Sequence, residues 1–111
     1  METEIRIDEP DASEKRWCLV VVDTDDATHE FFEKLGLQGG GYTWEGLANQ
    51  LIELKAPHLK GKLDINAEAE EMYAYAPSPG ALDELSKLLL SLTTDHQILK
   101  SIVDQAGDAI E

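Results

Sequence analysis

The stretch "RWCLVVVD", residues 16–23, decides the fold. It is a continuous apolar run with three valines, and β-branched residues favour strands over helices. Its short length and the lack of alternating polar residues predict a strand that is buried on both faces. We therefore place this strand at the centre of a β-sheet, with Cys18 as a buried thiol within it.

A first helix is expected directly after this strand. The segment "TDDATHEFFEKLGL", residues 24–37, can be capped by Thr24 or Asp25, and its apolar side chains recur at helical spacing. Gly36 stands where a helix commonly ends in the left-handed conformation. The buried stripe of this helix is expected to contain Ala27, Phe31, Phe32 and Leu35.

A run of three glycines opens the next segment, "GGGYTWEGLANQLIELKAP", residues 39–57. Gly39, Gly40 and Gly41 are expected to break regular structure and to turn the chain between two helices. Glycines also permit a close approach by another part of the backbone. Thr43 can cap the second helix, which ends before Pro57. The apolar face of this helix is expected to contain Trp44, Leu47, Ala48, Leu51 and Ile52.

The remaining sequence predicts two strands and two helices. In "KLDINAEAEEMYAYAPS", residues 62–78, apolar and polar residues alternate on both sides of an expected turn near residues 66–70. Ser78 and Pro79 suit the start of a helix, and Thr94 with Gln97 fits a capping box for a last helix. The buried faces of these helices are expected to contain Leu82, Leu85, Leu88, Leu89, Leu92, Ile98, Leu99, Ile102, Val103 and Ala106.

These elements predict an α+β fold in the order β-α-α-β-β-α-α. We expect a small, mostly antiparallel sheet of three to four strands, covered by about four helices. A chain of 111 residues is enough for one domain and too short for two. Residues 1–15 are expected to form an acidic arm, which is either an edge strand built on Ile5 and Ile7 or a frayed end. Residues 16–111 are expected to form the single α+β domain.

Charge is the most informative bulk property of the sequence. The chain has 23 acidic and 9 basic residues, a net charge of −14. A phosphate backbone would be repelled, so we expect no nucleic-acid binding, whereas a basic protein would be attracted. Acidity that serves only solubility is the alternative. Because no apolar run is long enough for a membrane span and no secretory signal is recognisable, we expect a cytoplasmic protein.

Motifs for catalysis or cofactor binding are absent from the sequence. The glycine run lacks the lysine of a P-loop, and it follows a helix where a dinucleotide fingerprint needs a strand. A calcium loop that starts at Asp23 fails because Thr28 and Lys34 occupy its sixth and twelfth positions. His29 and Glu33 could share a metal, but no third ligand is evident. We expect no enzyme activity, metal or cofactor; a small enzyme or metal protein that uses His29 and Glu33 is the alternative.

Tyrosine and tryptophan residues are the candidates for protein contacts. Both residue types bury a large area at a small entropic cost, which makes them frequent interface anchors. Tyr42 and Trp44 follow the glycine run, and Tyr73 and Tyr75 share one face of a predicted strand. Trp44 also lies on the apolar stripe of its helix, so a place in the core is the alternative for this side chain.

Two runs of the sequence resemble a known family. "GGGYTWEGL", residues 39–47, and "EAEEMYAY", residues 68–75, are similar to the signatures of immunity protein family fifty-one of bacterial polymorphic and contact-dependent toxin systems. The resemblance covers roughly residues 17–106 and leaves out the acidic arm.

The resemblance implies a protein that is not an enzyme, and that binds and neutralises the C-terminal toxin domain of a cognate effector in the cytoplasm. Many such toxins are basic nucleases, which an acidic inhibitor would bind by imitating phosphates. A general acidic interaction module or an antitoxin-like adaptor with a different basic partner is the alternative. The expected partner-binding residues are Asp23, Asp25, Asp26, Tyr42, Trp44, Glu45, Glu68, Glu70, Glu71 and Tyr73.

Overall fold

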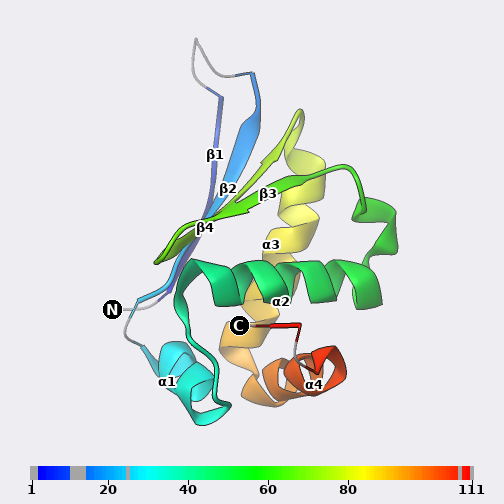
Figure 1. The fold of residues 1–111 in the computed structure, drawn as a ribbon. Helices are drawn as coiled ribbons and strands as arrows, with labels where there is room; N and C mark the ends of the chain where they lie inside the picture. Colours follow the sequence, from blue (N-terminus) through cyan, green and yellow to red (C-terminus); the bar gives the residue numbers. More distant parts are fainter. Residues whose placement is uncertain (1–2, 11–14, 25, 108, 111) are drawn as a thin grey trace.

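The structure, a computed structural model, describes residues 3–10, 15–24, 26–107 and 109–110. This part of the chain forms four strands and four α-helices, so the predicted α+β class is confirmed (Figure 1). The strands are β1 (Glu4–Asp8), β2 (Trp17–Val22), β3 (Asp64–Ala67) and β4 (Glu71–Ala76). The helices are α1 (Ala27–Lys34), α2 (Gly40–Lys55), α3 (Pro79–Thr94) and α4 (His96–Ala106), and a 3-10 turn, η1 (Pro57–Leu59), follows α2.

The four strands form one antiparallel sheet in the order β1-β2-β4-β3. The valine-rich strand β2 lies inside the sheet, as predicted, because its side chains are apolar on both faces. Strand β1 pairs with β2 along its whole length and forms one edge of the sheet. Residues 4–8 of the predicted acidic arm therefore belong to the sheet, whereas residues 11–14 lie outside the described part of the chain.

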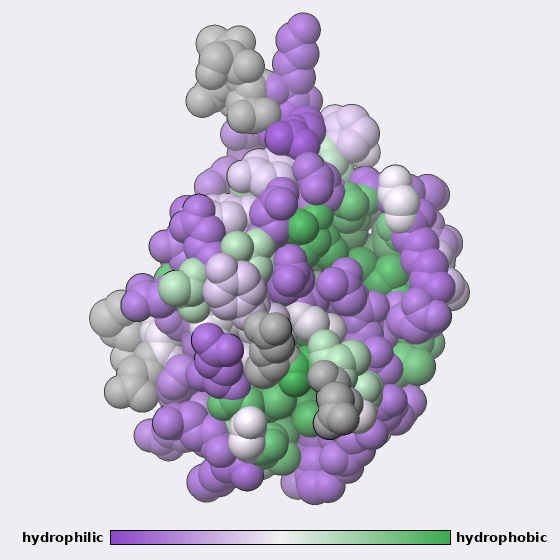
Figure 2. Space-filling model, in the orientation of Figure 1, coloured by the Kyte–Doolittle hydropathy of each residue, from purple (hydrophilic) through white to green (hydrophobic). Residues whose placement is uncertain are grey.

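The core lies between one face of the sheet and the helices. Helices α2 and α3 contact each other and the strands, which places both on the same face of the sheet (Figure 1). Nearly all of the side chains predicted for the apolar stripes of α2 and α3 are buried. The fully or almost fully buried ones include Trp44, Leu47, Leu51, Ile52, Leu82, Leu85, Leu89 and Leu92. On the outside of the helical layer, hydrophilic side chains dominate the surface, with apolar patches between them (Figure 2).

The second face of the sheet differs from the prediction. Strand register places Cys18, Val20, Tyr73 and Tyr75 on this face, opposite to the core residues. Val20 is only 3% exposed, but Cys18 is half-buried. The predicted burial of β2 on both faces is therefore wrong at Cys18, because no helix in the described residues packs on this side (Figure 1).

Helix starts also differ from the predicted ones. Asp26 caps α1, and its carboxylate accepts hydrogen bonds from the N–H groups of Thr28 and His29. Thr24 is therefore not the cap, and Asp25 lies outside the described residues. Asp95 caps α4 in place of Thr94. In both cases the aspartate directly precedes the helix, closer to the unpaired N–H groups of the first turn than the predicted threonine.

Candidate functional site

The glycine run lets α2 begin directly against the β3–β4 turn. Gly39 and Gly40 have φ angles of 82° and 77°, and Gly39 is the N-cap of α2. The prediction that all three glycines break regular structure is therefore wrong for Gly40 and Gly41, which lie inside the helix. Thr43 also lies inside α2, where its hydroxyl accepts a hydrogen bond from the N–H of Gly39 at 2.9 Å.

Residues 39–41 are here called the glycine elbow, and two of them, Gly40 and Gly41, touch the backbone between Glu68 and Glu71. A Cβ atom on Gly40 would lie 2.1 Å from the carbonyl oxygen of Ala69. A Cβ atom on Gly41 would lie 2.1 Å from the carbonyl oxygens of both Glu68 and Glu71. The N–H of Gly41 donates to the carbonyl of Ala69 at 3.1 Å. The close backbone approach that glycines permit is thus the reason for their presence.

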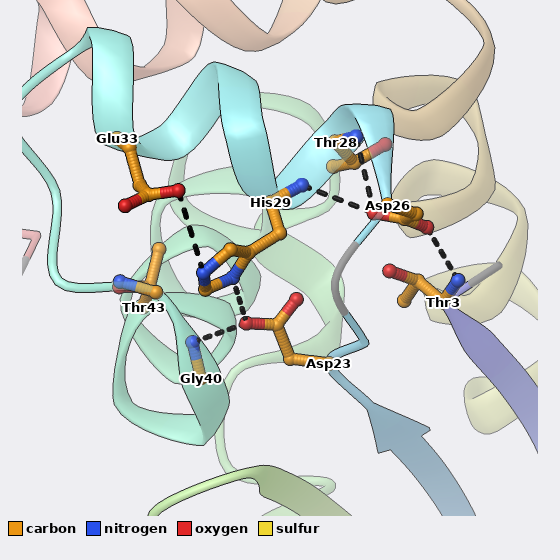
Figure 3. A network of polar contacts seen from close by, with 9 residues as sticks. Thr3, Asp23, Asp26, Thr28, His29, Glu33, Gly40 and Thr43 are labelled. Carbon is orange, nitrogen blue, oxygen red and sulfur yellow. Dashed lines mark hydrogen bonds and ion pairs between the residues drawn. The ribbon is translucent and has the colours of Figure 1, made fainter. Parts of the chain in front are cut away.

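Asp23 fastens the end of β2 to this elbow. Its N–H donates to the carbonyl of Glu70 at 2.9 Å, and its Oδ2 accepts from the N–H of Gly40 at 2.5 Å. The same oxygen lies 2.7 Å from Nδ1 of His29 (Figure 3). The negative charge lies at the positive end of α2, where it is stabilising. Because the side chain is only 3% exposed, Asp23 anchors the structure and does not belong to the predicted contact surface.

His29 lies between two carboxylates in a small open pocket. Its Nε2 is 3.8 Å from Oε1 of Glu33, on the side away from Asp23 (Figure 3). The pocket has a volume of about 320 Å³ and includes Gly39 and Glu70 in its wall. In the described ranges, no three His, Cys, Asp or Glu side chains are placed to hold a metal ion together. The contact with Asp23 is the shorter of the two that His29 makes with these carboxylates.

Two parts of the chain, α2 and the β3–β4 turn with the start of β4, bring acidic residues to this end of the molecule. The backbone bonds of Asp23 and Gly41 bring the β3–β4 turn beside the start of α2. Glu68 and Glu70 are exposed on the turn, and Glu71 opens β4. On α2, Tyr42 is 42% exposed and Glu45 is half-buried one turn further on. We call this surface the acidic end; its members are Tyr42, Glu45, Glu68, Glu70 and Glu71.

Trp44 does not take part in this surface. Its side chain is fully buried, and its ring packs edge-on against Phe32 with 5.3 Å between the ring centroids. The prediction that Trp44 contacts a partner is therefore wrong, and its alternative place in the core is confirmed. The neighbouring Tyr42 is exposed because it lies on the opposite side of the helix from the apolar stripe.

Tyr73 lies on the second face of the sheet and is linked to the acidic end. Its hydroxyl donates a hydrogen bond to the carboxylate of Glu71. Its ring stacks with that of Tyr75 at a centroid distance of 6.5 Å and an interplanar angle of 20°. The guanidinium of Arg16 lies over the ring of Tyr75, 4.4 Å from its centroid. Tyr75 and Arg16 were not among the predicted site residues, although the strand alternation already placed both tyrosines on one face.

A comparison with protein-family models matches residues 6–108 to the model described as Immunity protein 51. The chain belongs to the Immunity protein 51 family. An immunity protein acts against a toxin. The family match therefore confirms the expectation that the partner of this chain is a toxin protein. The match begins at Arg6 and so includes most of β1. The resemblance seen in the sequence began only at about residue 17 and did not include this strand. Searches of curated proteins and of solved structures each returned no match.

No helix in the described part of this immunity protein is long and apolar enough to cross a membrane. The hydrogen bonds of Asp23 and Asp26 form a polar network between the end of β2 and the starts of α1 and α2 (Figure 3). Asp26 is the member of this network whose effect on stability depends most clearly on pH.

Replacing Asp26 with alanine in this immunity protein should lower the free energy of unfolding by about 1–2 kcal/mol at neutral pH. Burial raises the pKa of Asp26, but hydrogen bonds from His29, Thr3 and Thr28 outweigh it, so the pKa lies below its ordinary value of 3.8. The ionised carboxylate therefore stabilises the fold above pH 3.8, and this contribution is lost as the pH falls through the lower folded pKa.

Urea unfolding of both proteins across this pH range measures the effect. The difference in stability between wild type and Asp26→Ala should shrink below pH 3.8. An undiminished difference in strong acid would show that the ionised carboxylate is not the source of the stabilisation.

Proposed function

We propose that this immunity protein neutralises its toxin by binding it through the acidic end, and that the toxin is a basic nuclease. The observation that carries the proposal is the meeting of acidic residues from separate parts of the chain on one surface. Glu68 and Glu70 come from the β3–β4 turn, and Glu45 comes from α2. The hydrogen bonds of the glycine elbow fix the turn and the helix relative to each other.

Electrostatics supports a basic partner. The net charge of −14 attracts a positively charged protein over distances longer than a contact and speeds its association. A nuclease active site binds phosphates with lysine and arginine side chains, and carboxylates on a rigid surface can occupy those same groups. We assign this role to Glu68 and Glu70, which are exposed, and the role of an aromatic anchor to Tyr42, which is exposed in the first turn of α2.

The proposed mechanism needs no chemical step by the immunity protein. Binding occupies the toxin surface, and the lifetime of the complex sets the protection. The partner is the C-terminal toxin domain of the cognate effector, and the cytoplasm is the place where a nuclease would meet its substrate. The carboxylates of the acidic end act as binding groups and not as acids or bases.

The triple variant Glu45→Lys, Glu68→Lys, Glu70→Lys tests the acidic end. Its Kd for the toxin domain encoded by the upstream neighbouring gene should rise about 100-fold or more, equal to about 2.8 kcal/mol. The reason is that each lysine would face the basic groups of the toxin. Calorimetry measures the Kd, and rescue of growth in cells that express the toxin measures protection.

The matched control reverses three acids on other parts of the surface. Asp83, Glu84 and Asp104 lie on α3 and α4, and their ion pairs are solvent-exposed, so they contribute little to stability. Reversing them to lysine changes the net charge by the same amount as the test variant. The control should bind the toxin within a few-fold of wild type. Equal losses in both variants would mean that net charge matters and the acidic end does not.

A further inference from the structure

We propose that the uncovered face of the β-sheet is a second contact surface for the toxin, with Tyr73 and Tyr75 as its anchors. This inference rests on the proposed function, because it takes the same basic toxin as the partner. It adds a surface that has an aromatic centre and lies on the opposite face of the sheet from α2 and α3.

The register of the strands defines this face. Residues opposite each other on neighbouring strands point to the same side of a sheet. One row of the uncovered face is Arg6, Val20, Tyr73 and Asn66, and the next row is Asp8, Cys18, Tyr75 and Asp64. The members from the edge strands are exposed, and the central members are partly or fully buried by their neighbours. Helices α2 and α3 lie on the opposite face (Figure 1).

Aromatic side chains at the centre of this face are held in place before any partner arrives. The rings of Tyr73 and Tyr75 stack on each other, and the guanidinium of Arg16 lies over the second ring. The hydroxyl of Tyr73 is bonded to Glu71. Side chains that are already ordered lose little conformational freedom on binding, so they make efficient anchors.

Charged side chains surround this aromatic centre. Arg6 forms ion pairs with Glu4 at 2.6 Å and Asp8 at 3.1 Å. Arg16 forms an ion pair with Asp64 at 3.2 Å. Together with Glu71, the described carboxylates on this face outnumber the guanidinium groups, which leaves the rim negative. An aromatic centre within a charged rim is the usual composition of a protein–protein interface.

Charge also decides which partner fits this face. A second copy of this chain would bring a net charge of −14 against an equal charge, so self-association is opposed by repulsion. A basic toxin would be attracted to the negative rim. The face is continuous with the acidic end, because Glu71 belongs to the acidic end and its carboxylate accepts a hydrogen bond from Tyr73 on this face. One toxin domain could therefore contact both surfaces around the β3–β4 turn.

Cys18 offers a direct test in the unmodified protein. It is the only cysteine in the chain, and it lies opposite Tyr75 on the uncovered face. Burial raises the pKa of its thiol, so alkylation with iodoacetamide should be followed at mildly alkaline pH. The rate should fall about tenfold or more when Cys18 is covered in the saturated toxin complex. An unchanged rate in that complex would overturn the proposal.

A moved cysteine supplies the control for this footprint. In the double variant Cys18→Ser, Gln105→Cys the thiol is on the exposed side of α4, away from the sheet. Its alkylation rate should be the same with and without the toxin. Protection at this position as well would mean that the toxin slows alkylation without covering the sheet face, and would also overturn the proposal.

The anchors are tested by the double variant Tyr73→Ser, Tyr75→Ser, with Tyr42→Ser as a single-site comparison. The double variant should bind the toxin about 100-fold more weakly while keeping the circular dichroism of wild type. If the double variant does not fold, two single variants replace it, Tyr73→Phe and Tyr75→Lys. Of these, Tyr75→Lys should weaken binding of the toxin about tenfold. Wild-type affinity in the folded double variant, or in folded Tyr75→Lys where the double variant does not fold, would overturn the proposal. Failure of the wild-type protein to bind the toxin at all would instead overturn the proposed function.

Discussion

Replacing Gly41 with alanine should destabilise the protein by about 4 kcal/mol or more, the largest effect we expect from a single methyl group in this chain. The new Cβ would lie 2.1 Å from the carbonyl oxygens of Glu68 and Glu71. Both are backbone oxygens, one in the β3–β4 turn and one at the start of β4, so they cannot move away by a side-chain rotation. Relief would require α2 to separate from the sheet, which would also break the hydrogen bond from Gly41 to Ala69.

Gly80→Ala is the matched control for this substitution. Gly80 also lies in the first turn of a helix, α3, and a Cβ atom there would meet nothing within 4 Å. Alanine at this position should raise the free energy of unfolding by about 0.5–1 kcal/mol, because it reduces the freedom of the unfolded chain. Urea unfolding compares the two variants. Equal stability of Gly41→Ala and wild type would show that α2 does not lie against the turn as described.

Replacing Trp44 with alanine should lower the free energy of unfolding by about 3–5 kcal/mol. The indole is fully buried between the sheet and the helices, and its removal leaves a cavity that the surrounding core cannot fill. Phe32 also loses its edge-to-face partner. Thermal and urea unfolding both measure this loss, which is a large part of the total stability of a domain of this size.

Trp44→Phe separates the core role of this residue from a role in binding. The Nε1 atom of Trp44 is buried and has no hydrogen-bond partner among the described residues, so removing it breaks no hydrogen bond there. Phenylalanine keeps most of the buried area and should cost only about 1–2 kcal/mol. Because the side chain is not on the surface, the affinity for the toxin should be unchanged. A strong loss of affinity in a folded Trp44→Phe protein would place this residue in the interface after all.

Parts of the fold were predictable where a single segment contains the residue types or the spacing that identify a strand or a helix. The valine run of β2 and the helical spacing from Trp44 to Ile52 each predicted an element that the structure has. The C-terminal end of α1 was also predicted: Gly36 has a φ of 79°, and the N–H of Leu37 reaches the carbonyl of Phe32 at 2.9 Å. These features depend on residues within a few positions of one another.

The candidate site was predictable only in part. The acidic segments were visible in the sequence, but the burial of Asp23 was not, because an aspartate after a strand is usually exposed. Its partners Gly40 and His29 come from different helices, and nothing in the order of residues shows that they meet. The choice between core and surface for Trp44 also required the packing of α2 against α1.

The amino-acid sequence by itself determined most of the strands and helices and the strong negative charge, because periodicity, β-branching and charge are properties of neighbouring residues or of the whole composition. Only the tertiary structure decided what Gly41 touches, where Asp23 is buried and which face of the sheet is left uncovered. Each of these depends on contacts between segments that are distant in the chain, such as Gly41 with Glu68 and Glu71. Such contacts follow from how the elements pack and not from the pattern within any one of them.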